Sequence, residues 1–320
     1  MAMKMNIRIL LICISCFGMG ACESLVTEID DADLPKTESR LVVQSFISPE
    51  NQKTLVVVSQ SAPLFGQDIP EALLISNALV TISNGSQEAV VPYDSVNMLY
   101  AIDKSRFPIE AGKKYTITAS DGKRSVNAFC TVPIKIVSAK SFEIDTTLSS
   151  NFSNDTLLTL KMQWDDIPGE RNFYRVRAFI DLEYSVPDDT NPAEFKERRV
   201  RSRFNVNWEE TIGRDNFQSD ASLDGTVFTS PRGTLRLPGI TAYDLGNGNV
   251  FTVYPKSKIV SVTMEVFNTD EVYYRYHKSL DNARNSDNPF VEPSLVFTNI
   301  NGGLGCFAAY HIGQLVYRAE

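Results

Sequence analysis

Few residues of this chain have a type and spacing that could do chemistry. The sequence holds two histidines, His277 and His311, and a histidine base needs a serine or cysteine nucleophile within hydrogen-bond reach. Neither lies in a Gly-x-Ser-x-Gly or His-Glu-x-x-His pattern, the patterns typical of serine hydrolases and zinc proteases. The sequence therefore predicts no catalytic residue, and each histidine is expected to have a structural role.

Carboxylate pairs occur at two predicted turns, Asp165-Asp166 and Asp188-Asp189. Glycosidases use two carboxylates ~5–9.5 Å apart in a cleft, and sequence spacing does not show such a distance. A surface hydrolase with an unrecognised carboxylate pair therefore stays open as an alternative. The chain after residue 21 contains no Cys-x-x-Cys pair, and the sequence contains no Asp-x-Asp-x-Asp-Gly calcium loop, so we expect no metal site and no cofactor. A structural Ca²⁺ held by loop aspartates stays open as the alternative.

One cluster of positive charge lies in a predicted strand over residues 194–208. The period-two alternation of a strand places Arg199, Arg201 and Arg203 on one face. Three guanidinium groups on one face could bind a carboxylate or phosphate ligand. The alternative is a solvated face, or an edge strand that its charges guard against further pairing.

The chain begins with the pattern of an exported protein. Lys4 and Arg8 precede an almost uncharged run, Ile9 to Ala21, which is shorter than the ~20 residues of a membrane span. This is the pattern of a secretory signal peptide over residues 1–21. Its end, Gly20-Ala21-Cys22, resembles the bacterial lipobox, so we expect Cys22 to carry a lipid that anchors the protein to a membrane.

Residues 22–35 are acidic and predict a solvated tether. An acidic stretch after the lipidated cysteine resembles the export signal of surface lipoproteins in Bacteroidetes. We therefore expect a lipid-anchored protein of the outer membrane that faces the cell surface, with a periplasm-facing anchor as the alternative. The net charge of −8 argues against a nucleic-acid partner.

Removal of the signal peptide and lipidation of Cys22 leave two cysteines, Cys130 and Cys306. Export brings them to an oxidising compartment, so one disulfide and two buried free thiols are both open. Three short motifs resemble the Asp-Ser/Thr-apolar O-glycosylation signal of exported Bacteroidetes proteins. Their acceptor residues are Ser95, Thr146 and Thr156.

Residues 36–135 alternate short β-branched runs with turn signals, which predicts an immunoglobulin-like β-sandwich. Asn84-Gly85 and Asp121-Gly122 predict hairpins. Alternate residues from Val126 to Val132 are apolar or carry a thiol and are expected to face the core.

Residues 136–320 predict a second β-rich domain with one α-helix near the C-terminus. Alternate apolar residues from Leu158 to Trp164 predict one buried face. A cap-like start at Asn268 precedes a helical pattern in which Tyr273 and Tyr276 are expected to face the core.

Seven stretches of the chain together resemble a known family. They are Arg40 to Ile47, Asn77 to Ile82, Gly112 to Tyr115, Leu223 to Gly225, Tyr273 to Tyr276, Asn288 to Pro293 and Asn299 to Phe307. With the lipobox they resemble the Bacteroidetes outer-membrane lipoprotein family of unknown function, domain-of-unknown-function family 4249, over nearly the whole mature chain. The resemblance implies an outer-membrane lipoprotein that works beside a TonB-dependent transporter, and it supplies no catalytic residues.

These observations predict a non-enzymatic accessory or ligand-binding partner of a TonB-dependent transporter. Its support is the lipid anchor, the family resemblance and the lack of a catalytic motif. The alternatives are a surface hydrolase and a structural or adhesive surface protein. A β-rich fold serves all three roles, so fold class does not choose among them.

Overall fold

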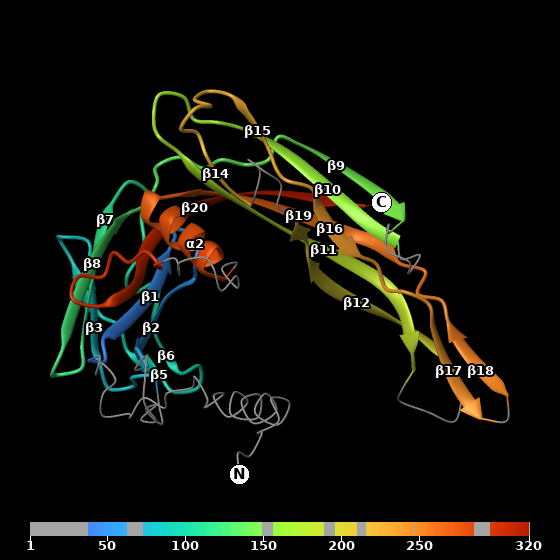
Figure 1. Cartoon of the computed structure of the whole chain (residues 1–320), viewed down its shortest axis with the longest axis horizontal. Helices are drawn as coiled ribbons and strands as arrows, with labels where there is room; N and C mark the ends of the chain where they lie inside the picture. The colour runs from blue at the N-terminus through green and yellow to red at the C-terminus, as the bar shows by residue number, and fades with distance from the viewer. Residues whose placement is uncertain are drawn as a thin grey trace, which may run out of the picture. The chain divides into compact units, whose positions relative to one another are not determined.

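The computed structural model describes residues 38–62, 73–148, 156–188, 196–209, 216–246, 248–284 and 295–319. In these ranges the chain forms β-strands and one helix near the C-terminus (Figure 1), which confirms the predicted fold class. None of the helices found there is long and apolar enough to cross a bilayer. The predicted signal peptide, residues 1–21, and the predicted tether, residues 22–35, lie outside the described residues.

The largest sheet has nine strands. Its order is β12 (Glu197–Asn205), β11 (Phe173–Pro187), β19 (Lys258–Thr269), β20 (Leu304–Arg318), β1 (Leu41–Ile47), β2 (Lys53–Gln60), β6 (Leu99–Asp103) and β5 (Tyr93–Asp94), with β14 (Phe217–Ser219) paired to β11. Strands from both halves of the chain therefore share one hydrogen-bonded sheet.

Strand β20 is the element that joins the two halves. Its first part pairs in parallel with β1, from Val42 opposite Leu304 to Ile47 opposite Ala309. Its second part pairs antiparallel with β19, from Thr269 opposite Tyr310 onward. Because one strand serves both partners, the two ends of the described chain are held in one sheet.

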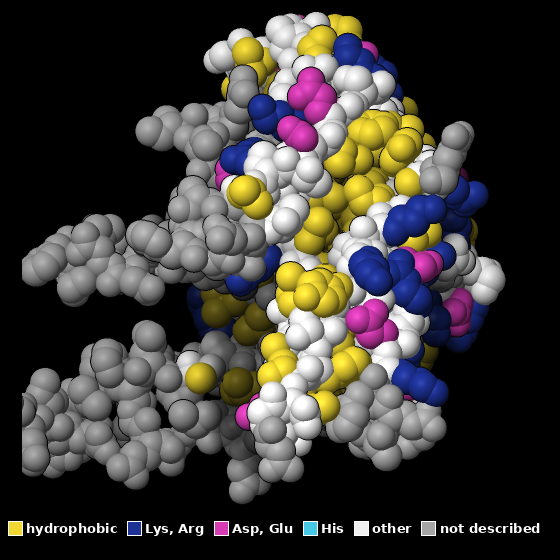
Figure 2. Space-filling view, turned by 90° about the vertical axis from the view of Figure 1, so that its right-hand side faces the viewer, with side chains coloured by type: hydrophobic (Ala, Val, Ile, Leu, Met, Phe, Trp, Pro, Cys, Tyr) yellow, Lys and Arg dark blue, Asp and Glu magenta, His cyan; other side chains and the backbone are white. Residues whose placement is uncertain are grey.

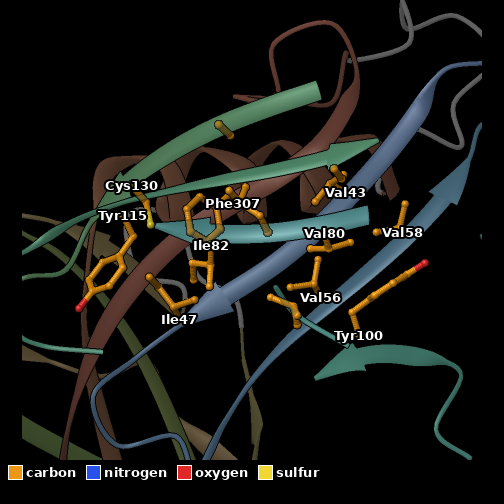
Figure 3. Packing of buried hydrophobic residues seen from close by; sticks show 14 of the residues in the cluster. Val43, Ile47, Val56, Val58, Val80, Ile82, Tyr100, Tyr115, Cys130 and Phe307 are labelled. Carbon is orange, nitrogen blue, oxygen red and sulfur yellow. The ribbon is translucent and has the colours of Figure 1, made fainter. Parts of the chain in front are cut away.

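A second sheet packs on the β1–β2–β6 part of the first. Its order is β4 (Glu88–Val90), β3 (Leu79–Ser83), β7 (Lys114–Ser120) and β8 (Ser125–Thr131). Antiparallel pairing of β3 with β4 and of β7 with β8 confirms the hairpins predicted at Asn84-Gly85 and Asp121-Gly122. In Figure 3, Val43 of β1 and Ile82 of β3 point into a common core, together with Phe307 of β20. This is the predicted sandwich, and the end of the chain completes its core.

The predicted face of β8 is confirmed, since Val126, Ala128, Cys130 and Val132 are all buried.

The predicted division of the chain into residues 36–135 and 136–320 stays a prediction. The structure adds that Ile300, Phe307 and Ala309 fill the core of the first stretch.

A second hydrophobic core lies between β11 and β19 and a five-stranded sheet. That sheet has the order β13 (Asn207–Trp208), β16 (Gly233–Arg236), β10 (Thr156–Asp165) and β15 (Val227–Thr229), and β9 (Ser141–Leu148) also pairs with β10. The predicted buried face from Leu158 to Trp164 is confirmed. Trp164 stacks on Phe228 and meets the edge of Tyr174, with ring centroids 5.6 and 5.9 Å away. These rings anchor the second core.

The helix α2 (Glu271–Arg284) corrects one prediction. Its N-cap is Asp270, whose Oδ1 accepts a hydrogen bond of 2.7 Å from the Tyr273 amide, and not Asn268. Strand β19 continues through Thr269, so Asn268 is still a buried strand residue, and its side chain donates to the Lys135 carbonyl. Tyr273 and Tyr276 are buried, as predicted.

The two remaining strands form a ribbon that pairs only with itself among the described strands. They are β17 (Thr241–Gly246) and β18 (Asn249–Val253). All six residues of β17 are exposed. A two-stranded ribbon is at best marginally stable alone, so this one depends on what holds its base.

The close approach of β20 to β1 depends on Gly305. This residue has φ +104°, and a Cβ placed there would overlap the carbonyl oxygen of Val43. Any other residue would be strained by its backbone conformation and would also clash with β1. The parallel pairing therefore requires glycine at this position.

We predict that Gly305→Ala lowers the free energy of unfolding by about 3 kcal/mol or more. The matched control is Gly85→Ala, because Gly85 also has positive φ, +88°, but has open space around its Cβ. That control should cost only about 1 kcal/mol. Urea denaturation of both variants measures the difference, and equal losses would contradict the role assigned to the clash.

Candidate functional site

The three arginines of the predicted ligand site lie on the exposed face of β12, the last strand of the described sheet. Arg201 and Arg203 approach Asp181 on β11 with N–O distances of 3.9 and 3.6 Å. The guanidinium of Arg203 also lies 5.0 Å from the centroid of the Phe179 ring. These contacts form a charged face between neighbouring strands. That Arg199, Arg201 and Arg203 bind a ligand stays a prediction.

Arg199 makes a different set of contacts. Its Nη1 donates to the carbonyls of Pro255 (3.3 Å) and Lys256 (3.1 Å), and its Nε donates to Glu183 (3.0 Å). The Ser185 amide also donates to the Pro255 carbonyl, at 2.7 Å. Pro255 and Lys256 lie just beyond the end of β18, after Tyr254, so these hydrogen bonds attach the base of the ribbon to β11 and β12.

The ribbon exposes large apolar side chains to solvent. They are Ile240 (65% exposed), Tyr243 (40%), Leu245 (36%), Val250 (60%) and Tyr254 (52%), and we call them the ribbon surface. Tyr243 pairs with Phe251 and Asp244 pairs with Val250. Tyr243 and Val250 therefore lie on opposite faces of the ribbon, and the ribbon surface includes both faces. Figure 2, which views the side where the ribbon is drawn in Figure 1, shows hydrophobic side chains beside lysines and arginines. Grouped exposed apolar residues mark interaction sites on folded proteins. The ribbon surface is therefore the leading candidate for contact with a partner.

A groove of 660 Å³ lies on the outer faces of β1 and β2. Phe46, Leu55 and Val57 supply apolar walls, and Gln44 and Tyr310 supply polar groups at its margin. Concave apolar surfaces with a few polar groups are typical of small-ligand sites. The groove is a second candidate, for a ligand and not for a protein partner.

Both histidines have structural contacts. The His277 ring stacks on Tyr273 with centroids 4.1 Å apart, and its Nδ1 lies 2.9 Å from the Tyr273 carbonyl. His311 is buried, and its Nε2 lies 2.9 Å from a carboxylate oxygen of Glu50. These contacts fit the structural roles expected from the sequence.

A cavity of 370 Å³ is lined by Asp270, a carboxylate with a strongly raised pKa. Asp270 lines this cavity with Glu170 and Glu271. Loss of hydration raises the pKa of Asp270 to about 7, against hydrogen bonds from the Tyr273 and Ala309 amides, which lower it. Because its two oxygens accept these amides at 2.7 and 3.1 Å, Asp270 is engaged as a helix cap.

Three other carboxylates gather away from this cavity. Asp166, Asp220 and Asp224 each offer an oxygen atom, and these atoms lie within 4.8 Å of one another. The sequence pointed to no metal site, because the three residues come from two separate turns. Oxygen atoms grouped in this way are the type of ligand set that a hard divalent cation uses.

Cys22, the predicted lipidation site, lies outside the described residues. Ser95, Thr146 and Thr156 are exposed, so an enzyme could reach them, and their glycosylation stays a prediction. Cys130 and Cys306 are buried free thiols, which decides between the two alternatives that the sequence left open.

A family model described as a domain of unknown function, DUF4249, matches residues 23–315. The chain belongs to this family. The resemblance seen in the sequence is thereby confirmed, while the lipid anchor, the outer membrane and the bacterial group stay predictions. No curated protein matches the DUF4249 chain in sequence.

We predict that the stability of this DUF4249 protein falls as pH rises from about 4 to about 7. The pKa of Asp270 is raised from 3.8 to about 7 in the folded state, so in this interval the folded chain keeps a proton that the unfolded chain releases. The loss is up to about 4 kcal/mol for this group. The negative charge of Glu271 also raises the pKa of Asp270. The thiols of Cys130 and Cys306 lie within electrostatic range of the Asp270 carboxylate.

Asp270→Asn keeps a cap residue but removes the titration. Its free energy of unfolding, measured by urea at several pH values, should lose this slope, while the Glu271→Gln control keeps it. Parallel curves for wild type and Asp270→Asn would contradict the assignment.

Proposed function

We propose that this DUF4249 protein is an outer-membrane lipoprotein, anchored through Cys22, that works as a non-enzymatic partner of a TonB-dependent transporter. It docks on the transporter through the ribbon surface. The cell-surface leaflet is the proposed location, and the lipid on Cys22 is the proposed contact with the membrane.

The anchor is supported by the start of the chain. Lys4 and Arg8 with the apolar run have the pattern of a secretory signal, the Gly-Ala-Cys end resembles a lipobox, and the family match begins directly after Cys22. Several acyl chains, each methylene contributing about 0.8 kcal/mol, hold a protein on a membrane durably. A tethered protein meets membrane partners at high effective concentration, so a modest docking surface suffices.

The observation that carries the docking proposal is the exposed ribbon. Its strands pair only with each other among the described strands, and its large side chains are apolar. Arg199 fixes its base, so the ribbon is presented in a defined direction. Tyrosine is among the residues enriched at the energetic centres of protein interfaces, and a preorganised element loses little conformational freedom on binding.

The hydrolase alternative draws less support from the described carboxylates. Each carboxylate oxygen of Asp270 accepts a hydrogen bond from a backbone amide. A general acid instead needs an oxygen that faces the substrate. The groove on β1 and β2 is compatible with the accessory role, because a transporter partner can also hold a ligand.

We predict that tagged full-length protein, purified from detergent-solubilised outer membranes, recovers a TonB-dependent transporter in stoichiometric amount. The double variant Tyr243→Ser and Val250→Ser should lower this recovery about tenfold or more, because central apolar contacts each contribute more than about 1 kcal/mol. Quantitative mass spectrometry of the purified samples measures the ratio.

The matched control is Ile136→Ser with Leu148→Ser, which changes two exposed apolar residues, 55% and 71% exposed, outside the ribbon. This control should recover the transporter as wild type does. Recovery of the lipoprotein alone in several mild detergents would contradict the partnership, and equal recovery by the ribbon variant would contradict docking through the ribbon.

A further inference from the structure

Two turns bring three aspartates together at one end of the second core. Asp166 lies in the turn after β10, and Asp220 and Asp224 lie in the turn after β14. Their carboxylates contribute oxygen atoms within 4.8 Å of one another. Three negative charges at this separation repel strongly unless a cation lies among them.

Hydrogen bonds hold each carboxylate in position. Asp166 accepts from the Tyr174 hydroxyl (2.7 Å) and from the Gly225 amide (2.8 Å). Asp224 accepts from the Gly169 amide at 2.8 Å. Asp166 and Asp224 are thus each bonded to the opposite turn, so the cluster is preorganised.

Asp220 is the residue that points to a ligand. It is 4% exposed, its Oδ2 accepts from the Asn172 amide at 2.9 Å, and its buried Oδ1 accepts no hydrogen bond from the described residues. Burial raises the pKa of Asp220, and the charges of Asp166 and Asp224 raise it further. A buried carboxylate oxygen without a partner is costly, and a cation bound between the three aspartates would remove that cost.

We propose that Asp166, Asp220 and Asp224 form a calcium site. Ca²⁺ takes carboxylate oxygens in flexible geometry and completes its shell with carbonyl groups and water. The donor set has only oxygen atoms, which disfavours zinc and other metals that prefer nitrogen or sulfur. The bound ion links the turn after β10 to the turn after β14, and thereby braces one end of the second core.

The sequence signal for this site is weak because its ligands are divided. Asp220 and Asp224 are four positions apart and precede Gly225, whose φ of +69° aims its amide at Asp166. The third ligand comes from a turn far earlier in the chain. A search for a continuous calcium-binding loop therefore does not detect this site.

The test uses the full chain in detergent, first stripped of metal with EDTA. Tb³⁺ replaces Ca²⁺ at oxygen sites and emits when a nearby tyrosine or tryptophan is excited. Tyr174 donates to Asp166, and the Trp164 ring lies 5.9 Å from the Tyr174 ring. We expect sensitised Tb³⁺ emission that Ca²⁺ displaces, and a melting temperature raised by about 5 °C at about a hundred times the dissociation constant of Ca²⁺.

Asp220→Asn should lose the emission and the calcium-dependent rise, and weaken Ca²⁺ binding about tenfold or more. Without metal this variant should melt no lower than wild type, because one repelling charge is gone. Asp224→Asn changes an exposed ligand and gives a second variant should Asp220→Asn fail to fold. The control is Asp165→Asn, which changes a neighbouring carboxylate that is 66% exposed and pairs with Lys140; it should behave as wild type.

Three results would overturn the proposal. The first is a wild-type chain that shows no sensitised emission. The second is sensitised emission and calcium-dependent stabilisation that both ligand variants keep. The third is equal stabilisation by Mg²⁺, which demands a tighter octahedral shell.

Discussion

The parallel pairing of β1 with β20 is the contact on which the other described features depend. It joins the first described strand to the last, and six residue pairs hold it, from Val42 with Leu304 to Ile47 with Ala309. Parallel strands need a long connection, and here nearly the whole chain is that connection. The contact therefore carries a large loop-closure cost, which burial of Phe307 and Ala309 in the first core offsets.

The same sheet positions the elements proposed to act. From β20 it continues through β19 and β11 to β12, and Arg199 on β12 holds the carbonyls at the base of the ribbon. Hydrogen bonds thus run without interruption from the sandwich to the strands that hold the ribbon. A docking element attached in this way loses little freedom on binding.

Local patterns predicted local structure well. Asn84-Gly85 and Asp121-Gly122 marked true hairpins because their turn geometry is encoded in two residues, and the alternation from Leu158 to Trp164 marked a true buried face. The helix cap was misplaced by two residues because β19 runs on through Thr269 before Asp270 takes the cap.

Features built from distant residues were not predictable. The pairing of β1 with β20, the gathering of Asp166 with Asp220, and the attachment of the ribbon through Arg199 all depend on tertiary contacts, which local spacing does not encode. The arginines of β12 were visible as a charged face, but the carbonyls that Arg199 binds were not.

One sheet couples the first and second cores, and each of these cores contains its own probe of unfolding. Cys130 is buried in the first core, while Trp164 is buried in the second core and Trp208 packs against it. Thiol labelling of Cys130, read by peptide mass spectrometry so that it is resolved from Cys306, and tryptophan fluorescence can be followed across one urea titration. A shared sheet predicts coincident midpoints; two separated midpoints would show that the two cores unfold independently and that the sheet does not couple them.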